Sequence, residues 1–257
     1  FNVTVSATNT GGASGTYTIQ FKLDNNVLFT KDVTLDPGAS VDQVFTLSIN
    51  STGSHNLAAG DKTKTVQVVN PLFSDVRVRQ AFVYAFDYET YIKEIEKGGA
   101  IVPNGPVPKG MFGYNASIPP YEYNLTKARE LLQQAAADFG FSHDRPFSLT
   151  LYYNEGNVAR EKGCLLLASA INNLDVGLRL DVSALAWPQF LAKYRAKELP
   201  IFFLGWAPDY IDGDDYLVPF LHSQKGNFPI RTGYANPLVD QLIDEQSRIV
   251  DPAERLA

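Results

Sequence analysis

The periodicity of apolar residues changes at Asn70-Pro71, and this change divides the chain into two parts. Before it, apolar and polar residues alternate in short runs separated by Gly, Asn, Asp and Pro, a pattern typical of strands buried on one face. After it, helical runs alternate with short apolar runs that are typical of strands. We therefore expect a multidomain chain, with an all-β domain over residues 1–69 and an α/β domain over residues 70–257.

The first part is expected to form a small β-sandwich. Its first run places Val3 and Val5 on one face and Thr4 on the other, and the later runs alternate in the same way. Short strands at this spacing, joined by turn residues and with almost no helical pattern, are typical of a sandwich. The expected strands are Phe1–Asn9, Thr16–Leu23, Val27–Leu35, Val41–Ile49 and two shorter ones around His55–Leu57 and Thr63–Val69.

The second part begins with an expected helix over Asp75–Glu96, capped by Ser74 and bearing a wide apolar face. Arg79 lies on this mostly apolar helix, and we expect it to pair with a carboxylate. Residues 100–124 are rich in Pro and Gly and predict a loop. Further helices are expected over Leu125–Phe139, Val158–Leu174, Trp187–Ala196 and Asp240–Ile249, and strands over Phe147–Tyr153, Leu178–Val182 and Ile201–Leu204.

Charge and composition exclude several classes of partner and cofactor. The 257 residues are 45% hydrophobic, and 22 Lys and Arg against 28 Asp and Glu give a net charge of −6, so no positive field favours nucleic acid. Cys164 is the single cysteine, which excludes an intrachain disulfide and a cysteine-based zinc site. We expect it to be a buried, inert thiol. The three His have no metal-ligand spacing, and we expect neither a metal nor a cofactor.

The stretch Leu204–Phe220 is the main candidate for a ligand site. It follows an apolar strand-like run and places Trp206, Asp209 and Tyr210 within five residues of each other. An aromatic wall with a single charge is a common composition for a ligand pocket. The alternative interpretation is a loop in which Trp206 belongs to the core and the acidic residues cap the next helix. These are Asp209, Asp212, Asp214 and Asp215.

Residues 1–69 resemble the immunoglobulin-like CARDB modules of archaeal and bacterial surface proteins. The residues that carry this resemblance are Asn9-Thr10-Gly11 in one turn and Leu35–Ser40 (LDPGAS) before a strand. The resemblance implies an immunoglobulin-like sandwich that acts as a spacer or an adhesion unit. It implies no ligand.

The chain from residue 71 resembles the second lobe of the family 5 extracellular solute-binding proteins of ABC transporters, the oligopeptide, dipeptide and nickel-binding group. Several phrases occur in the family's order and approximate spacing. They are Phe73–Asp87, Pro106–Gly110, Tyr123-Asn124 with Lys127–Leu132, Phe203–Tyr210 (FLGWAPDY), Tyr234–Asp240, and Asp251 with Arg255. The resemblance implies an α/β lobe of the periplasmic-binding-protein type.

The same resemblance assigns roles to individual residues. Asp209 matches the carboxylate that pairs with the free α-amino group of the ligand in peptide-binding members, and Trp206 matches a position beside that pocket. Tyr210 is a weaker candidate for a ligand contact, and Trp187 is a candidate for either the core or the cleft wall. Family members have two lobes that close around the ligand. We interpret the present chain as a processed or truncated piece that supplies at most half of such a cleft.

The leading hypothesis is therefore the extracellular substrate-binding component of an ABC importer, which captures a peptide or an oligosaccharide and presents it to permease subunits. The alternative is a structural or adhesive cell-surface protein whose lobe no longer binds. No nucleophile elbow or triad signature occurs, so we do not expect an enzyme.

We expect an extracellular or cell-surface location. No apolar run approaches the ~18 residues of a membrane span, so contact with the membrane would need an anchor outside this sequence. Four sequons for N-glycosylation favour an exported chain, although the last could cap a helix instead. They begin at Asn2, Asn50, Asn115 and Asn124.

Overall fold

The computed structural model describes residues 2–47, 49, 53–68 and 71–256. It divides the chain into two compact units, Phe1–Val69 and Asn70–Ala257. Each unit has its own hydrophobic core, and each is described separately below. Asn50, the second sequon, lies outside the described residues.

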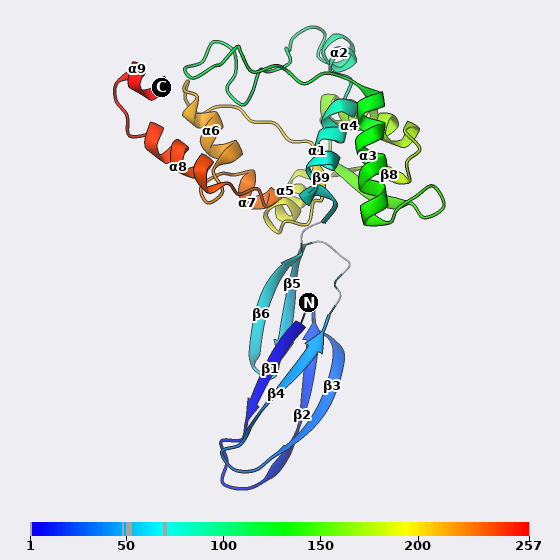
Figure 1. Ribbon diagram of the computed structural model, residues 1–257, viewed down its shortest axis with the longest axis vertical. Helices are drawn as coiled ribbons and strands as arrows, with labels where there is room; N and C mark the ends of the chain where they lie inside the picture. Colours follow the sequence, from blue (N-terminus) through cyan, green and yellow to red (C-terminus); the bar gives the residue numbers. More distant parts are fainter. Residues whose placement is uncertain (1, 48, 50–52, 69–70, 257) are drawn as a thin grey trace. The chain divides into compact units, whose positions relative to one another are not determined.

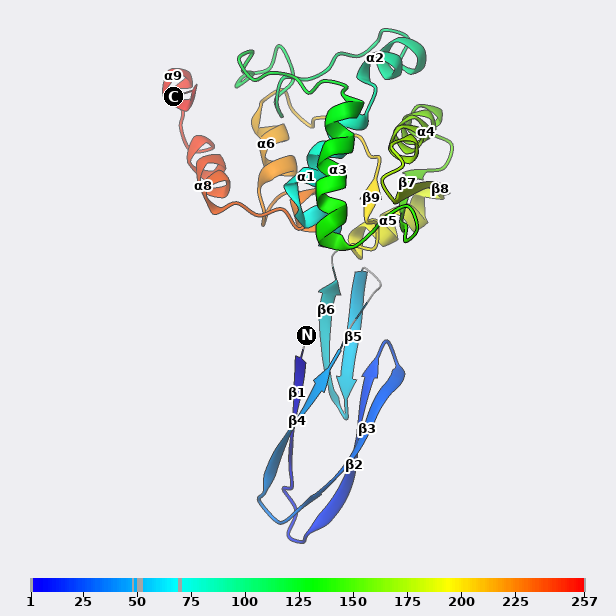
Figure 2. The ribbon, with the colours of Figure 1, turned by 45° about the vertical axis from the view of Figure 1, so that its right-hand side comes forward.

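The first unit consists of antiparallel strands in two sheets (Figures 1 and 2). One sheet pairs β1 with β4, and the other has the order β3-β2-β5-β6. All six expected strands are present, and the fifth is longer than expected. Their bounds are β1 Asn2–Thr8, β2 Gly15–Leu23, β3 Asn26–Leu35, β4 Ser40–Thr46, β5 Gly53–Ala59 and β6 Lys62–Val68.

The two sheets of the first unit share one core. Phe21 from β2 stacks on Phe45 from β4, with ring centroids 5.2 Å apart. Ile19 and Leu57 are buried beside them. The turn between β2 and β3 uses Asp24 and Asn25 with positive φ, as expected for residues that tolerate this conformation. The β1 side chains that point to the core remain only half-buried.

The first helical region of the second unit is broken, which corrects the prediction of one helix over residues 75–96. Helix α1 is Val76–Ala85, α2 is Tyr88–Thr90, and a short π-helical segment, η2, follows. Asp87 causes the break, because its carboxylate accepts the Thr90 backbone N–H at 3.0 Å and the Thr90 hydroxyl at 2.8 Å. A new helix therefore begins here, although the apolar periodicity continues.

Two finer expectations for this region are also wrong. Asp75, not Ser74, caps α1, and its carboxylate accepts the Arg77 backbone N–H at 2.8 Å. Arg79 forms no ion pair with a carboxylate among the described residues; its guanidinium donates to the carbonyl oxygens of Phe73 and Ser74 at 2.8 and 2.9 Å. Arg79 is exposed, so water also solvates its charge.

The sheet of the second unit is parallel, with the order β8-β7-β9. Helix α4 connects β7 to β8, and α5 connects β8 to β9. The α/β prediction is therefore confirmed. The strands are β7 Phe147–Asn154, β8 Leu178–Leu185 and β9 Ile201–Phe202. The remaining elements are η1 Pro71–Ser74, η2 Tyr91–Ile95, α3 Leu125–Phe139, α4 Val158–Asn173, α5 Trp187–Arg195, α6 Asp214–Leu221, α7 Pro229–Thr232, α8 Pro237–Gln246 and α9 Pro252–Leu256.

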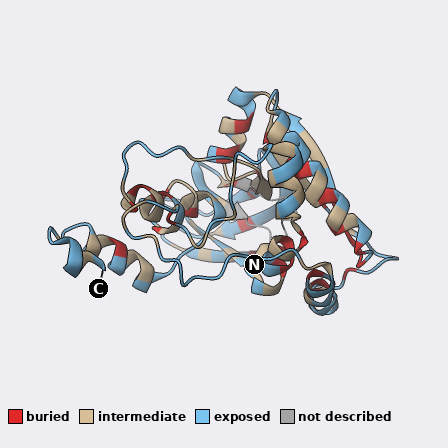
Figure 3. Ribbon diagram, turned by 90° about the horizontal axis from the view of Figure 1, so that it is seen from above, coloured by how far each residue is buried: buried red, intermediate tan, exposed pale blue. Residues whose placement is uncertain are grey.

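Helices α1, α3 and α4 bury side chains in one core with β7 and β8, and Figure 3 shows buried and exposed positions alternating along the helices. Asn124 caps α3 by accepting the Lys127 backbone N–H at 2.9 Å, as predicted. Helix α8 begins three residues before the expected start. Asn236 caps it and Pro237 occupies the first turn, where a missing N–H costs nothing.

Candidate functional site

The candidate residues lie after the carboxyl ends of the parallel strands. Trp187 follows β8, and Trp206 and Asp209 follow β9. The Phe203 backbone N–H still donates to the Tyr152 carbonyl at 2.8 Å, so the chain leaves the sheet only after this residue. In open α/β sheets, ligands bind at this end of the strands. The fold therefore gathers the predicted residues at the edge where a ligand is expected.

Asp215 in the first turn of α6 organises the loop that carries Trp206 and Asp209. Its side chain is buried, with the residue 6% exposed. The carboxylate accepts the backbone N–H of Asp209 and, at 3.4 Å, that of Tyr210. Its backbone carbonyl accepts the Trp206 indole N–H at 2.9 Å. One residue thus fixes both ends of the segment 206–210.

Trp206 is half-buried in an aromatic cluster. Its ring packs edge-on against Phe220 and Phe228, with centroids 6.3 and 6.2 Å away. Phe220 and Phe228 stack on each other at 4.5 Å. The orientation of the indole is therefore set by rings on two sides and by its bond to Asp215. Trp206 is built into the wall of the site and does not project freely from it.

Asp209 differs from the other three aspartates of this stretch. It is exposed, and its carboxylate has no hydrogen-bond or ion-pair partner among the residues that the structure describes. The Asp214 carboxylate accepts the Tyr210 hydroxyl at 2.9 Å. Partial burial and this bond raise the pKa of Tyr210 to about 12. Tyr210 is thus held in place by Asp214, whereas the charge of Asp209 is unpaired.

Asp212 is the fourth aspartate and serves the structure of the loop. Its two carboxylate oxygens accept the Arg255 guanidinium at 2.8 and 2.7 Å. It also accepts the Asp214 backbone N–H at 2.8 Å, which helps to begin α6. The bond from Arg255 holds the pKa of Asp212 below its ordinary value of 3.8. Asp212 thus has a structural role and Asp209 does not, while the N-cap position of α6 itself is Gly213.

Trp187 lies at the start of α5 and is 47% exposed. Its ring stacks on the buried Phe190 at 5.8 Å. A series of ring contacts then leads through Tyr194 to Phe228, which touches Trp206. The two tryptophans thus belong to one aromatic network, in which Trp187 is an exposed end. No contact between Trp187 and Asp209 is present among the described residues.

Two further residues of the site carry no clear sequence signal. Arg160 on α4 donates to the Asn154 side-chain oxygen at 2.6 Å. A Cβ atom on Gly205 would lie 2.9 Å from the Arg160 guanidinium, so a glycine before Trp206 lets this cation approach the loop. Arg160 is far from Trp206 in the sequence, and Asp215 looks like the neighbouring aspartates. The sequence alone therefore places neither residue at the site.

The comparison with protein families gives a match over most of the chain. Residues 9–228 match the family described as bacterial extracellular solute-binding proteins, family 5 Middle. The chain belongs to this family. The resemblance inferred from the sequence phrases is therefore confirmed, and the family match also extends into the first unit.

Curated relatives of this chain have names that refer to different ligands. The chain is 26% identical to heme-binding protein A of Haemophilus influenzae over 183 residues, covering 71% of this chain and 33% of the relative. It is 30% identical to the dipeptide-binding protein of Escherichia coli over 170 residues, covering 66% of this chain and 30% of the relative. The chain thus spans about a third of the length of the curated relatives it matches.

Solved structures show the same fold. The periplasmic binding protein DppA from Helicobacter pylori, in complex with the peptide STSA, superposes with a TM-score of 0.63 at 21% identity. The superposition covers 98% of this chain and 39% of that one. The expected lobe of the periplasmic-binding-protein type is confirmed.

The remaining sequence expectations concern modification, metals and membranes. Asn2 and Asn115 are exposed. The Asn2 side chain accepts the Thr46 hydroxyl at 2.9 Å, and Asn124 is engaged as a helix cap. No cluster of His, Cys, Asp or Glu that could hold a metal ion occurs in the described part of the chain. Within the same part, the helices are too short or too polar to span a membrane.

Proposed function

We propose that the second unit is a ligand-binding lobe of the substrate-binding component of an ABC importer, and that its ligand is a peptide whose α-amino group binds Asp209. The observation that carries this proposal is the unpaired, exposed carboxylate of Asp209 in a loop whose other aspartates are engaged. An ammonium group bound there would form a charge-assisted hydrogen bond, which is about twice as strong as a neutral one.

Family membership supports the class of function, and the site supports the class of ligand. The named relatives bind heme, dipeptides and the peptide STSA, so the family alone does not select a ligand. A peptide presents a cation to Asp209, whereas an oligosaccharide presents only hydroxyl groups. Trp206 and the exposed Trp187 would suit sugar stacking, and Tyr210 would line either ligand. Because the chain offers one free carboxylate in this loop, we favour a peptide.

The test compares the peptide Ser-Thr-Ser-Ala with its N-acetylated form, using calorimetry on the 257-residue chain. Acetylation removes the positive charge and leaves the rest of the peptide unchanged. We expect the free peptide to bind about tenfold to a hundredfold more tightly, since a hydrogen bond to a charged group contributes about 1.5–3 kcal/mol. Asp209→Asn should reduce this ratio to about one.

The matched control is Asp181→Asn, which removes another exposed carboxylate of the same unit on β8. It should leave the ratio unchanged. Equal binding of the two peptides by the native chain would refute the role of Asp209. Binding of maltotriose without binding of either peptide would replace the peptide by an oligosaccharide.

The proposal extends to the first unit and to the location of the protein. We take residues 1–69 as a separate domain, a CARDB-like immunoglobulin module that serves as a spacer. Its two antiparallel sheets around one core support this assignment. The protein would act outside the cytoplasmic membrane, deliver its ligand to permease subunits and catalyse no reaction. The exposed Asn2 and Asn115 would be available for glycosylation.

One observation favours a second function, a structural cell-surface lobe that no longer binds. The Trp206 indole N–H is satisfied internally by Asp215, and its ring is packed by Phe220 and Phe228. A tryptophan engaged in this way can belong to a core. The calorimetric test separates the two functions, because a structural lobe would bind neither peptides nor sugars.

A further inference from the structure

His222 ends helix α6 and is buried, with only 3% of the residue exposed. Its Nδ1 atom accepts the backbone N–H groups of Gln224 and Lys225, at 3.2 and 3.3 Å. An imidazole nitrogen can accept a hydrogen bond only when it carries no proton. The geometry therefore fits the neutral imidazole, whose proton lies on Nε2 and is directed at the Asp244 carboxylate, 3.3 Å away.

The two N–H groups belong to a tight turn that follows α6. Within it, the Gly226 backbone N–H donates to the His222 carbonyl at 2.7 Å, and the Phe228 N–H donates to the Pro219 carbonyl at 2.9 Å. A Cβ on Gly226 would lie 2.5 Å from the His222 carbonyl oxygen, so a glycine allows the chain to return this closely. Backbone and side chain of His222 thus both accept N–H groups of the turn.

The turn places Phe228 in the aromatic wall of the candidate site. The Phe228 ring stacks on Phe220, with centroids 4.5 Å apart, and its centroid lies 6.2 Å from that of Trp206. Tyr194 packs on the other side of Phe228, and its hydroxyl donates to the Asn227 carbonyl at 3.0 Å. Loosening of the turn would therefore move one of the two rings that orient Trp206.

Helix α8 offers the protonated imidazole a second set of partners. Asp240 Oδ1 lies 3.7 Å from Nδ1, and Asp244 Oδ1 faces Nε2. Asp240 accepts the Ser223 backbone N–H at 2.8 Å and also the Ser223 hydroxyl, while Lys225 donates to Asp244. A proton on Nδ1 would need Asp240 as its acceptor. The N–H groups of Gln224 and Lys225 would then lose theirs.

The other charged side chains on the helices beside α6 have partners of their own. Glu245 on α8 is exposed and accepts the side-chain amide of Gln241 at 2.7 Å. The Arg231 guanidinium on α7 lies over the Tyr194 ring, 5.4 Å from its centroid. In the described part of the chain, the charged groups that face the imidazole or its carboxylates are Asp240, Asp244 and Lys225.

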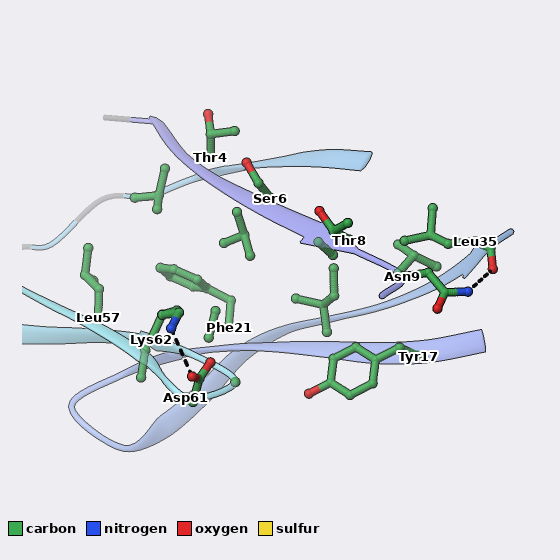
Figure 4. Close-up of a pocket in the computed structure, with 18 of the residues that line it drawn as sticks. Thr4, Ser6, Thr8, Asn9, Tyr17, Phe21, Leu35, Leu57, Asp61 and Lys62 are labelled. Atoms are coloured by element: carbon green, nitrogen blue, oxygen red, sulfur yellow. Dashed lines mark hydrogen bonds and ion pairs between the residues drawn. The ribbon is translucent and has the colours of Figure 1, made fainter. Parts of the chain in front are cut away.

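The other two histidines belong to other parts of the fold. His143 is exposed and precedes β7, so it lies at the opposite end of the parallel strands from the site. His55 belongs to the first unit. The cavity of that unit, of about 1180 Å³, is drawn in Figure 4, and its described lining residues include no histidine. Among the described contacts of the three, only those of His222 lead to the aromatic wall.

We propose that His222 is a positioning residue of the ligand site. In its neutral form it holds the turn 222–226 and thereby places Phe228 against Trp206; in its protonated form it releases the turn. Imidazole is the side chain whose charge ordinarily changes between about pH 5 and 8. Acidification in this range turns Nδ1 from the two N–H groups to Asp240 and loosens the wall. The effect on a ligand rests on the function proposed above, whereas the effect on the turn does not.

The test measures hydrogen exchange of the 257-residue chain at about pH 7.5 and about pH 5.5, with each rate divided by that of an unstructured peptide at the same pH. In the native chain, protection of the Gln224 and Lys225 amides should fall about tenfold at the lower pH, because both lose their acceptor. His222→Asn is the decisive variant. Its side-chain oxygen can occupy the position of Nδ1 and does not titrate, so protection should be equal at both pH values.

Two further variants serve as references. His222→Gln keeps a group that can face Asp244 but no acceptor at the position of Nδ1, so both amides should exchange rapidly at either pH. His143→Gln is the matched control, because it removes the exposed histidine of the same unit, and its pH response should equal that of the native chain. Native protection that is the same at both pH values would overturn the proposal, as would a loss that persists in His222→Asn.

The ¹⁵N signal of His222 in the native chain gives a measurement that needs no variant to fold. Nδ1 should carry no proton at about pH 7.5 and should gain one on acidification, together with the loss of amide protection. A proton on Nδ1 at the higher pH, with the two amides still protected, would contradict the role of Nδ1 as their acceptor.

Affinity for Ser-Thr-Ser-Ala extends the test to the site. The α-amino group of the peptide also gains a proton in this range, so the native chain is compared with His222→Asn at each pH. The two should bind alike at the higher pH, and the native chain should bind more weakly at the lower one. A ratio that stays constant would overturn the positioning role. If neither chain binds the peptide, the proposed function fails, while the exchange experiment still decides whether His222 holds the turn.

Discussion

The backbone N–H of Asp209 donates to the buried carboxylate of Asp215, six residues along the chain. This bond fixes the main chain from which the Asp209 side chain projects, and the Asp209 carboxylate stays free for another partner. Because Asp215 holds its backbone, Asp209 keeps its charge at a defined place without an ion-pair partner. This is the arrangement of a positioned binding group supported by a buried acceptor.

Asp215→Ala should loosen the loop and destabilise the second unit. The substitution removes the acceptor for two backbone N–H groups, and an unsatisfied donor costs about 1–3 kcal/mol. Asp215→Asn keeps one oxygen acceptor and should cost less. Both tryptophans lie in the second unit, so tryptophan fluorescence during urea unfolding reports on that unit alone. Equal stability of the native chain and Asp215→Ala would mean that the carboxylate does not hold the loop.

Two glycines of the same loop should respond differently to alanine. A Cβ on Gly213 would lie 2.5 Å from the Phe112 carbonyl oxygen, which is backbone and moves only with the chain. A Cβ on Gly205 would meet only the flexible end of Arg160. We expect Gly213→Ala to destabilise the second unit by about 1–3 kcal/mol, and Gly205→Ala to cost clearly less. Urea unfolding followed by tryptophan fluorescence compares the two, and a reversed order would contradict this account.

The sequence predicts most of the regular structure because local patterns determine it. The strands of the first unit follow from alternation, and the cap at Asn124 follows from residue type and position. The break after α1 was not predicted, because the apolar period continues beyond it. Asp87 ends that helix through bonds to Thr90, and such competition between a side chain and the helix is not visible in periodicity.

The candidate site was predicted less completely, and the four aspartates explain why. All lie between residues 209 and 215 and look alike in sequence. What distinguishes them is the partner that the fold brings to each. Asp212 meets Arg255, which is 43 residues away, and Asp214 meets Gln246, which is 32 residues away. Only tertiary structure separates the free carboxylate of Asp209 from the structural ones.

Cys164 should not react with thiol reagents while the second unit is folded. The side chain is buried in the main core, and burial raises the pKa of its thiol to about 12. The thiolate is the reactive species, so neither access nor ionisation favours reaction at pH 8. Ellman's reagent should label the protein only when urea unfolds this unit. Rapid labelling of one thiol per chain in native buffer would contradict the packing of this residue.

The ion pair between Asp212 and Arg255 should make the second unit less stable in acid. The pKa of Asp212 is lowered below 3.8 in the folded chain, chiefly by the bond from Arg255. As the pH falls, Asp212 is therefore protonated in the unfolded chain before it is protonated in the folded chain. The contribution of the ion pair to the free energy of unfolding is complete above about pH 4 and is lost as the pH falls through the folded pKa of Asp212.

Asp212→Asn isolates this contribution from those of other carboxylates. Above about pH 4 the variant should be less stable than the native chain by about 1 kcal/mol, a value typical of a partly exposed pair. The difference should shrink as the pH falls toward 2, because the native Asp212 then loses its charge. Urea unfolding at several pH values, followed by tryptophan fluorescence, measures both free energies. A difference that stays constant over this range would mean that the charge of Asp212 does not stabilise the fold.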